Sequence, residues 1–225
     1  MLTYGGVFIL AQLYTILDQK AGGVVSLLGM TNTMFNNFVV AFMFQFSVTI
    51  LLVWLFTVVI NRARWRDLGL RVNSARDFLT YGLFGGLGIL ALVMIISALI
   101  YQLQPGIKPQ DFEQMLKTVN STRGFLTMLL LGAVLAPLYE ELLFRGMLYP
   151  AVRRYLGPTG GAIVAGLIFG LAHWDLWRTI PLVIGGTLFC YIYEKTGSIL
   201  VTALAHGTWN GIMALIIYLN VMKVV

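Results

Sequence analysis

Charged residues are scarce in this chain, and cysteine is almost absent. Only 11% of the 225 residues are Asp, Glu, Lys or Arg, and Cys190 is the single cysteine. One cysteine excludes a scaffold held by internal disulfides. Scarce charge excludes a solvated, disordered chain and disfavours a nucleic-acid-binding surface. The composition therefore argues against a disulfide-held scaffold, a disordered chain and a nucleic-acid-binding domain.

Apolar residues take the place of the missing charge. They make up 59% of the sequence, and the mean hydropathy is +0.85. A soluble domain contains about 45–50% apolar residues, so this excess cannot be buried inside one water-facing globule. We predict an all-α fold, a polytopic transmembrane helical bundle that forms a single integral membrane domain over residues 1–225.

Windows of about 20 apolar residues, which cross a hydrocarbon core of roughly 30 Å, locate the helices. Spans are predicted at about 38–60, 78–101, 124–149, 158–175, 179–194 and 197–222. Met1–Leu17 is interpreted as a further span or anchor, and the polar stretch Thr31–Asn37 as a re-entrant or interfacial lead. This gives about six to eight helices around a buried polar site, with variable N-terminal helices over 1–123 and a core over 124–222.

Basic residues are distributed unevenly between these spans. The net charge is +6, and one loop holds Arg62, Arg64, Arg66, Arg71 and Arg76. The positive-inside rule predicts that the 61–77 loop is cytoplasmic, with Arg153, Arg154 and Lys195 on the same side. The segment 102–123 is then expected on the opposite side, where a short amphipathic helix could cover the bundle. We expect a multi-pass protein of a bacterial inner membrane.

Five ionisable side chains within predicted spans are singled out: Glu140, Glu141, Arg145, His173 and His206. Such groups cost a few kcal/mol in hydrocarbon and are therefore functional candidates. Counted from the nearest cytoplasmic flank, Glu140, His173 and His206 are 13, 16 and 11 residues away, or roughly 20, 24 and 16 Å along a helix. This similar depth predicts a single buried site.

Spacing within each helix indicates which side chains share a face. Glu141 and Arg145 are four residues apart and are expected to form an ion pair that fixes helix packing. Glu140 lies about 100° around the helix and can face a different cavity. His206 and Asn210 are also four residues apart and point toward one place.

These residue types suit hydrolysis of an amide inside the membrane. A buried carboxylate with a nearby histidine could deprotonate a water molecule. Donors from His206 and Asn210 could stabilise the oxyanion that forms. Pro137 lacks an N–H and should kink the helix before Glu140, which frees a carbonyl. The alternative reading of Glu140, His173 and His206 is a set of interhelical hydrogen bonds with a packing role alone.

The same residues carry a family resemblance. Glu140–Gly146, Phe169–His173 and His206–Asn210 resemble the EExxxR, FxxxH and HxxxN motifs of the CPBP family of type II CAAX prenyl endopeptidases and bacteriocin-processing or self-immunity proteins. The match covers roughly 124–222, and Arg66–Leu70 resembles a family loop more weakly. The resemblance implies an intramembrane endopeptidase with a site open toward the membrane. It makes Glu140 and His173 the water-activating pair, His206 and Asn210 the oxyanion pair, and Glu141 with Arg145 supporting residues.

No cofactor is favoured, although zinc is an alternative. Glu140, His173 and His206 could bind zinc and leave one position open for water. These ligands would come from three helices, so spacing does not decide between a zinc and a metal-free glutamate mechanism.

The expected partners are the lipid bilayer and a membrane-anchored peptide, which for CAAX enzymes is prenylated. No nucleic acid is expected as a partner, and the oligomeric state is left open. The alternative function is a non-catalytic membrane protein that confers bacteriocin immunity or modulates a sensor, which should tolerate Glu140→Gln. A proton-coupled transporter is disfavoured because the sequence shows no internal repeat.

Overall fold

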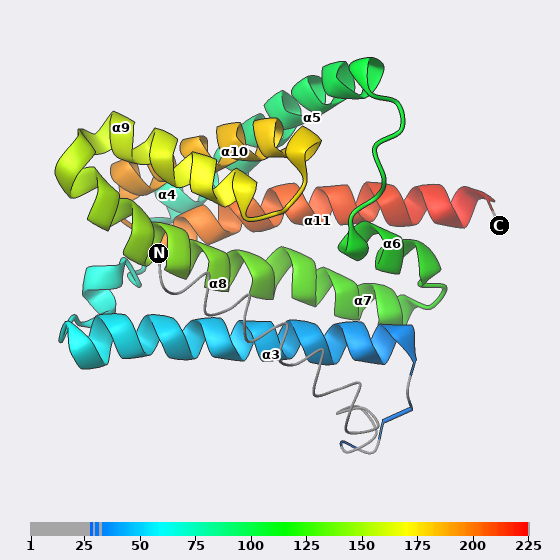
Figure 1. Ribbon diagram of the computed structural model, residues 1–225, viewed down its shortest axis with the longest axis horizontal. Coiled ribbons are helices and arrows are strands. Elements are labelled where there is room, and N and C mark those ends of the chain that lie inside the picture. Colours follow the sequence, from blue (N-terminus) through cyan, green and yellow to red (C-terminus); the bar gives the residue numbers. More distant parts are fainter. Residues whose placement is uncertain (1–27, 29, 32, 225) are drawn as a thin grey trace. The chain divides into compact units, whose positions relative to one another are not determined.

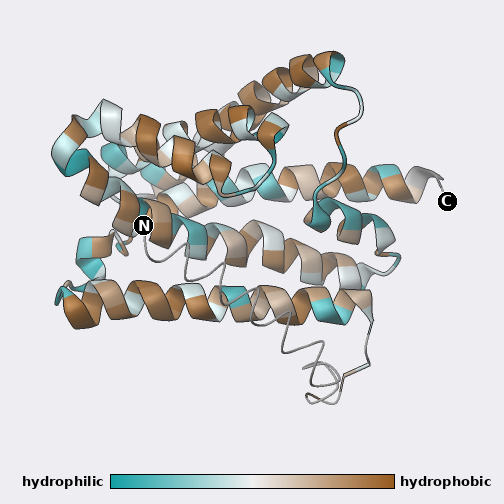
Figure 2. Ribbon diagram, in the orientation of Figure 1, coloured by the Kyte–Doolittle hydropathy of each residue, from teal (hydrophilic) through white to brown (hydrophobic). Residues whose placement is uncertain are grey.

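The computed structural model describes residues 28, 30, 31 and 33–224, and the regular elements among them are all helices (Figure 1). Met1–Leu17 lies outside the described residues. In the described part, five helical segments are long and apolar enough to cross a membrane: Met34–Ile60, Ala75–Leu103, Thr122–Leu171, Leu176–Thr196 and Ile199–Met222. Figure 2 shows these segments as predominantly hydrophobic ribbons joined by more hydrophilic turns. The prediction of an all-α transmembrane protein is confirmed.

The chain divides into two compact units, one up to Arg62 and one from Ala63 onward. In the first unit, α3 (Met34–Trp54) continues into the π-helix η1 (Leu55–Ile60). Thr33 Oγ1 accepts the Asn36 N–H at 3.2 Å, and Asn36 Nδ2 donates to the Thr31 carbonyl at 2.8 Å. Thr33 therefore caps the N-terminus of this span by accepting an open helix N–H, and Asn36 links the first turn to Thr31 before it. The span begins at Met34 rather than at 38.

The second unit begins with short elements and then becomes mainly long helices. Its elements are η2 (Trp65–Leu68), α4 (Ala75–Asp77), η3 (Phe78–Phe84), α5 (Gly85–Leu103), α6 (Asp111–Thr118), α7 (Thr122–Leu130), η4 (Leu131–Leu135), α8 (Ala136–Leu143), η5 (Phe144–Leu148), α9 (Tyr149–Leu171), α10 (Leu176–Thr196) and α11 (Ile199–Val224). Of these, η2 is a 3₁₀ turn, and η3, η4 and η5 are π-helical turns.

The long helical run from α7 to α9 breaks at Gly157. This residue has φ 70° and ψ 177°, a conformation that is open essentially only to glycine, and Pro158 follows it. Figure 1 shows the chain reversing direction at this point. The two arms correspond to the spans predicted at 124–149 and 158–175.

Glycines bring the helices of the second unit into close contact. A Cβ atom at Gly166 would lie 2.7 Å from the Val183 carbonyl oxygen of α10, and Gly170 is similarly close to α10. A Cβ at Gly86 of α5 would lie 2.5 Å from the Ala205 carbonyl oxygen of α11. These glycines therefore let helix backbones approach closely, as small residues do in lipid. The most apolar part of Ala75–Leu103 is only 22% buried, which leaves a wide apolar face for lipid.

The basic segments meet at one end of the bundle. Arg71 Nη2 donates to the Thr196 carbonyl at 3.0 Å, and the Ile199 N–H donates to the Gly69 carbonyl at 3.0 Å. These bonds join the arginine-rich loop to the turn between α10 and α11, beside Lys195. The 61–77 loop and the turn after Lys195 therefore lie at the same end of the second unit, while the assignment of this end to the cytoplasm stays a prediction.

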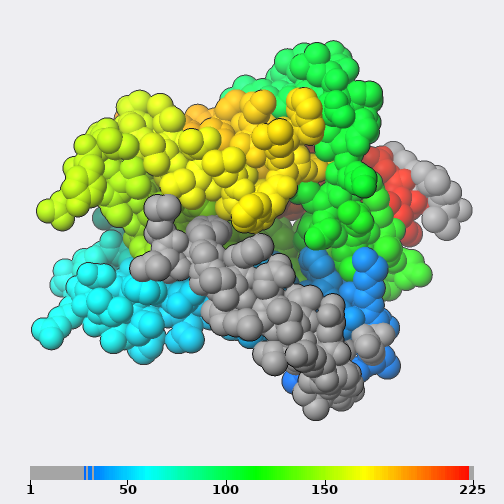
Figure 3. Space-filling model, in the orientation of Figure 1, coloured from blue at the N-terminus to red at the C-terminus, as the bar shows by residue number. Residues whose placement is uncertain are grey.

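The amphipathic helix predicted within 102–123 is α6, at the other end of the bundle. It buries Met115 and Leu116. Arg178 at the start of α10 donates to the Lys108 carbonyl at 2.8 Å, so the loop before α6 is tied to α10. Figure 3 shows the green surface of this loop and α6 beside the yellow start of α10.

Candidate active site

A buried ionic network lies where α8 and η5 meet α10 and α11. Arg145 Nη1 donates to Glu141 Oε1 at 2.9 Å, and His206 Nδ1 lies 3.0 Å from the same oxygen. The exposed fractions of Glu141 and Arg145 are 0%, and that of His206 is 4%. The ion pair expected from the four-residue spacing is therefore formed, and it extends to His206 on another helix.

The Arg145 guanidinium is held by the backbone of α10 and by three aromatic rings. Its Nη2 donates to the Gly186 carbonyl at 2.6 Å. Its Cζ lies 5.7 Å from the ring centre of Phe144 and 5.1 Å from those of Phe169 and Phe189. Ring faces attract a cation, and this attraction is stronger away from water. These contacts hold the charged part of η5 against α9 and α10.

Glu140 lies beside this network on a more open face of α8. Its Oε2 is 3.9 Å from His206 Nε2, and its side chain is 15% exposed. That distance exceeds a direct hydrogen bond and suits a bridging water. His206 therefore has Glu141 at Nδ1 and Glu140 on the side of Nε2. The two adjacent glutamates thus approach different nitrogens of one imidazole ring, and a separate cavity for Glu140 stays a prediction.

His173 lies in the turn after α9 and is joined to His206 through Phe169. Its Nδ1 lies 2.8 Å from the Phe169 carbonyl oxygen, which cannot donate, so Nδ1 carries the proton and Nε2 has a lone pair available when the ring is neutral. The Phe169 ring centre is 5.0 Å from that of His173 and 5.7 Å from that of His206. One aromatic residue thus positions both histidines, although their α-helices approach from different directions.

Asn210 contacts the helix that leads into Glu140. Its Nδ2 donates to the Gly132 carbonyl at 2.9 Å. Within the π-helical turn η4, a carbonyl accepts from the N–H five residues later, which for Gly132 would be Pro137. Proline has no N–H, so Asn210 supplies the missing donor. The carbonyl freed by Pro137 was expected from the sequence, and its partner on α11 is now identified.

We expect Asn210→Leu to reduce the free energy of unfolding by about 1–3 kcal/mol, because the buried Gly132 carbonyl loses its donor. In a Pro137→Ala background the loss should be smaller by about 1 kcal/mol, since residue 137 then has an N–H to donate. Both costs can be measured by unfolding titrations in detergent micelles. Equal costs in the two backgrounds would contradict this pairing of Asn210 with the proline-freed carbonyl.

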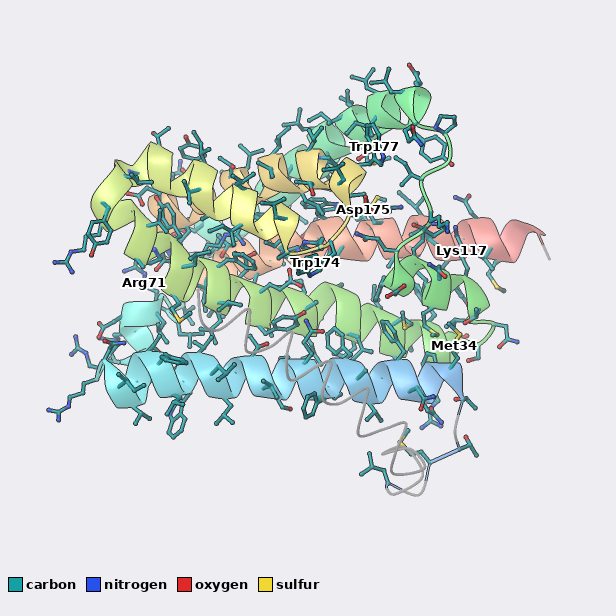
Figure 4. The ribbon with its side chains drawn as sticks, viewed as in Figure 1. Met34, Arg71, Lys117, Trp174, Asp175 and Trp177 are labelled. Atoms are coloured by element: carbon teal, nitrogen blue, oxygen red, sulfur yellow. The ribbon has the colours of Figure 1, made fainter. Side chains whose placement is uncertain are left out.

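An ion-pair clamp holds the turn that carries His173. Asp175 caps α10 by accepting the N–H groups of Trp177 and Arg178 at 3.1 Å each, and its carboxylate also pairs with the Arg178 guanidinium. Arg178 reaches Glu113 of α6 at 3.8 Å. Figure 4 shows Trp174, Asp175 and Trp177 along this turn. The turn with His173 is thereby fastened to the segment around α6.

The Asp175 carboxyl stays ionised over a wide pH range. Burial raises its pKa, but the hydrogen bonds and charge of Arg178 outweigh burial and bring the pKa below the usual 3.8. A lowered folded-state pKa contributes stability that is present above about 3.8 and is lost as the pH falls through the folded-state value. The clamp is therefore fully formed at neutral pH.

We expect Arg178→Gln to loosen the turn that carries His173. The variant removes a charge-assisted link to Asp175 and the hydrogen bond to Lys108. Such charge-assisted bonds contribute about 1.5–3 kcal/mol when well formed, and the partial exposure of Arg178 reduces this contribution. We therefore expect amide exchange over 105–118 and 171–178 to rise at least about fivefold. Hydrogen exchange with mass spectrometry measures this rise. Arg123→Gln is the matched control, and equal exchange in both variants would contradict the clamp.

The alternative zinc ligands do not come together as a set. In the part of the chain that the structure describes, no three His, Cys, Asp or Glu side chains could hold a metal ion. The Nδ1 atoms of His173 and His206 face the Phe169 carbonyl and Glu141, and a metal would have to bind at Nε2. The described side chains therefore do not form a three-ligand site.

Several residues of the site were not singled out by the sequence. Phe189 stacks on His206 with ring centres 4.9 Å apart, and the Gly186 carbonyl accepts from Arg145. Nothing in the sequence singled out either residue, because phenylalanine and glycine occur throughout such helices. Asp175 could have been found, because Asp is a preferred N-cap residue and stands shortly before a predicted helix.

Comparisons with known proteins agree with this geometry. Residues 122–212 match the family described as Type II CAAX prenyl endopeptidase, Rce1-like. A stretch of 83 residues is 26% identical to the Bacillus subtilis (strain 168) protein named "Putative membrane peptidase YdiL". This stretch covers 37% of the chain and 34% of YdiL, so the chain spans about a third of that relative. No solved structure matches the chain.

The matched range includes all six predicted site residues: Glu140, Glu141, Arg145, His173, His206 and Asn210. The part of the sequence that carries the buried network is thus also the part that the family comparison recognises. Residues 122–212 of this membrane protein form a domain of the Rce1-like type II CAAX prenyl endopeptidase (CPBP) family.

Proposed function

We propose that this protein is an intramembrane endopeptidase that hydrolyses a peptide bond of a membrane-associated substrate. The observation that carries the proposal is the position of Glu140, whose carboxylate faces His206 Nε2 at 3.9 Å beside the fully buried Glu141–Arg145 pair. A carboxylate and two imidazoles at the edge of an apolar bundle can accept and donate protons where bulk water is excluded. The family domain over 122–212 supports the same reaction class.

In the proposed reaction, Glu140 and His173 activate a water molecule. The water oxygen attacks the scissile carbonyl carbon while one of its protons passes to the Glu140 carboxylate and His173 Nε2 orients it. A C–O bond forms, and the carbonyl electron pair moves onto oxygen. The C–N bond then breaks, and the leaving nitrogen takes the proton from Glu140. The products are one carboxylic acid, which keeps the second water proton until it ionises, and one amine.

His206 and Asn210 are the proposed donors to the oxyanion. His206 directs Nδ1–H to the Glu141 carboxylate, so it can donate from Nε2 to the oxyanion only as an imidazolium, with a proton on both nitrogens. Asn210 Nδ2 has two hydrogens, of which the Gly132 carbonyl takes one. The second is available for the developing charge. Donors fixed in this way stabilise an oxyanion without reorganising during the reaction.

The proposed substrate is a peptide that reaches the site from the bilayer. The family description names CAAX prenyl endopeptidases, so a prenylated C-terminal peptide is the first substrate class to consider. A lipid anchor would hold such a peptide at the surface of the apolar helices. A membrane-anchored leader peptide is the equivalent in a cell without prenylated proteins.

Terminus-enriched mass spectrometry tests the proposal. Membranes from cells that express the wild type or Glu140→Gln at matched levels are compared. New C-termini and N-termini that appear only with the wild type are expected, and they would identify the substrate. Identical terminus profiles, with the cellular phenotype retained by Glu140→Gln, would overturn the peptidase and favour the non-catalytic binding function.

A further inference from the structure

The arginine-rich loop is a built structure rather than a flexible basic tail. Gly69 has φ 83° and lets the chain turn sharply after η2. Ser198 Oγ donates to the Arg71 carbonyl at 2.8 Å, and Asn73 Nδ2 donates to the Thr196 carbonyl at 2.9 Å. Together with the bond from Ile199 to Gly69, these contacts fix residues 69–73 against the turn between α10 and α11.

This loop lines an open pocket that the proposed reaction does not use. The pocket has a volume of about 630 Å³ and is lined by Arg66, Asp67, Leu70, Arg71 and Val72. Figure 4 shows Arg71 at the left end of the ribbon, well away from Asp175, which lies nearer the middle in this view. The pocket is therefore separate from the turn that carries His173.

The charges around the pocket favour an anion. Asp67 lies 3.4 Å from Arg64, which balances its carboxylate. Arg66 and Arg71 then leave an excess of positive charge. Arg71 uses one N–H on the Thr196 carbonyl, and a guanidinium has five N–H groups, so donors remain for a ligand. Arginine binds phosphate oxygens in pairs because its planar N–H groups match their spacing.

Exposed apolar side chains beside the arginines indicate a lipid rather than a soluble anion. Val72 is 82% exposed and Trp65 is 42% exposed. The membrane-spanning segment Ala75–Leu103 begins three residues after Val72, so this loop lies where the chain leaves the hydrocarbon. Tryptophan is typical of that interfacial layer, and basic residues there attract anionic headgroups.

We propose that the pocket lined by Arg66, Leu70, Arg71 and Val72 binds an anionic phospholipid of the adjoining leaflet. The two guanidinium groups hold the headgroup phosphate, and Val72 with Leu70 contacts the glycerol and the first methylenes of the acyl chains. The proposal does not depend on peptidase activity, because it concerns the other end of the bundle.

Native mass spectrometry of the full chain in detergent tests the site. The probes are phosphatidylglycerol, phosphatidylcholine and inorganic phosphate, each titrated into wild type, Arg66→Gln, Arg66→Lys and Arg76→Gln. Wild type should retain phosphatidylglycerol in preference to phosphatidylcholine, and Arg66→Gln should weaken that binding about fivefold, as expected for one interfacial basic residue. Arg66→Lys should keep most of the affinity. Arg76→Gln is the matched control, since Arg76 carries the same charge in the same loop and does not line the pocket.

Three results would overturn the site. Equal losses for Arg66→Gln and Arg76→Gln would indicate a diffuse attraction of the whole loop. Equal binding of phosphatidylcholine would show that charge does not select the ligand. Full displacement of the lipid by inorganic phosphate at millimolar concentration would show that the acyl part contributes nothing and that the ligand is a soluble anion. Thermal unfolding of each variant confirms that the compared proteins are folded.

Discussion

Replacing Glu140 with glutamine is expected to lower the rate of peptide cleavage by about 10²–10⁴-fold, the usual contribution of a positioned general base. The amide has nearly the shape of the carboxylate but cannot accept a proton from water. Glu140 lies at the edge of the buried network, with its side chain 15% exposed and 3.9 Å from His206. Its replacement should therefore leave the Glu141–Arg145 pair intact and change the chemical step more than the fold.

Cleavage of the substrate identified from the terminus profiles, measured in proteoliposomes, gives this rate. Asp111→Asn is the matched control, because it makes the same chemical change on the exposed side of α6. The thermal unfolding midpoint of Glu140→Gln should stay close to that of wild type. A cleavage rate within about threefold of wild type would contradict the assignment of Glu140 as the base, since general bases contribute more than that.

Much of the fold follows from composition alone. Uncharged runs of about 20 residues have one stable arrangement in lipid, because a helix satisfies its own backbone groups. The spans expected at 78–101 and 179–194 are accordingly observed as parts of Ala75–Leu103 and Leu176–Thr196. The exact turning points follow from local residues instead. Gly157 breaks the long run from Thr122 to Leu171, and Thr33 sets the start of α3.

The sequence predicted only part of the candidate site. Spacing along one helix fixes which side chains share a face, so the Glu141–Arg145 pair could be predicted from four residues of separation. Spacing does not fix how two helices rotate against each other. Hence the sequence did not show that His206 Nδ1 meets Glu141, nor that Asn210 meets Gly132. Both contacts depend on the orientation of α11 against α8 and η4.

Replacing Arg145 with methionine is expected to lower the free energy of unfolding by about 3–5 kcal/mol, because it leaves Glu141 as an uncompensated buried charge. Both side chains are completely buried, and the arginine also bonds to the Gly186 carbonyl. Among the described side chains, Glu141 Oε2 and Arg145 Nε have no hydrogen-bond partner. The network therefore has few other hydrogen bonds that could compensate for the loss of the ion pair. Unfolding titrations in mixed micelles measure the change.

The double variant Glu141→Gln with Arg145→Met separates the buried charge from the packing. A neutral pair of similar size removes the uncompensated carboxylate, so the double variant should be more stable than Arg145→Met alone. A double variant no more stable than the single one would show that Arg145 acts through the aromatic rings and the Gly186 carbonyl instead. Glu141 also holds His206 Nδ1, so this double variant should fold and yet cleave poorly. Stability and cleavage are then expected to respond to different members of one network: Arg145 contributes to the fold, Glu140 to the proposed cleavage, and Glu141 to both.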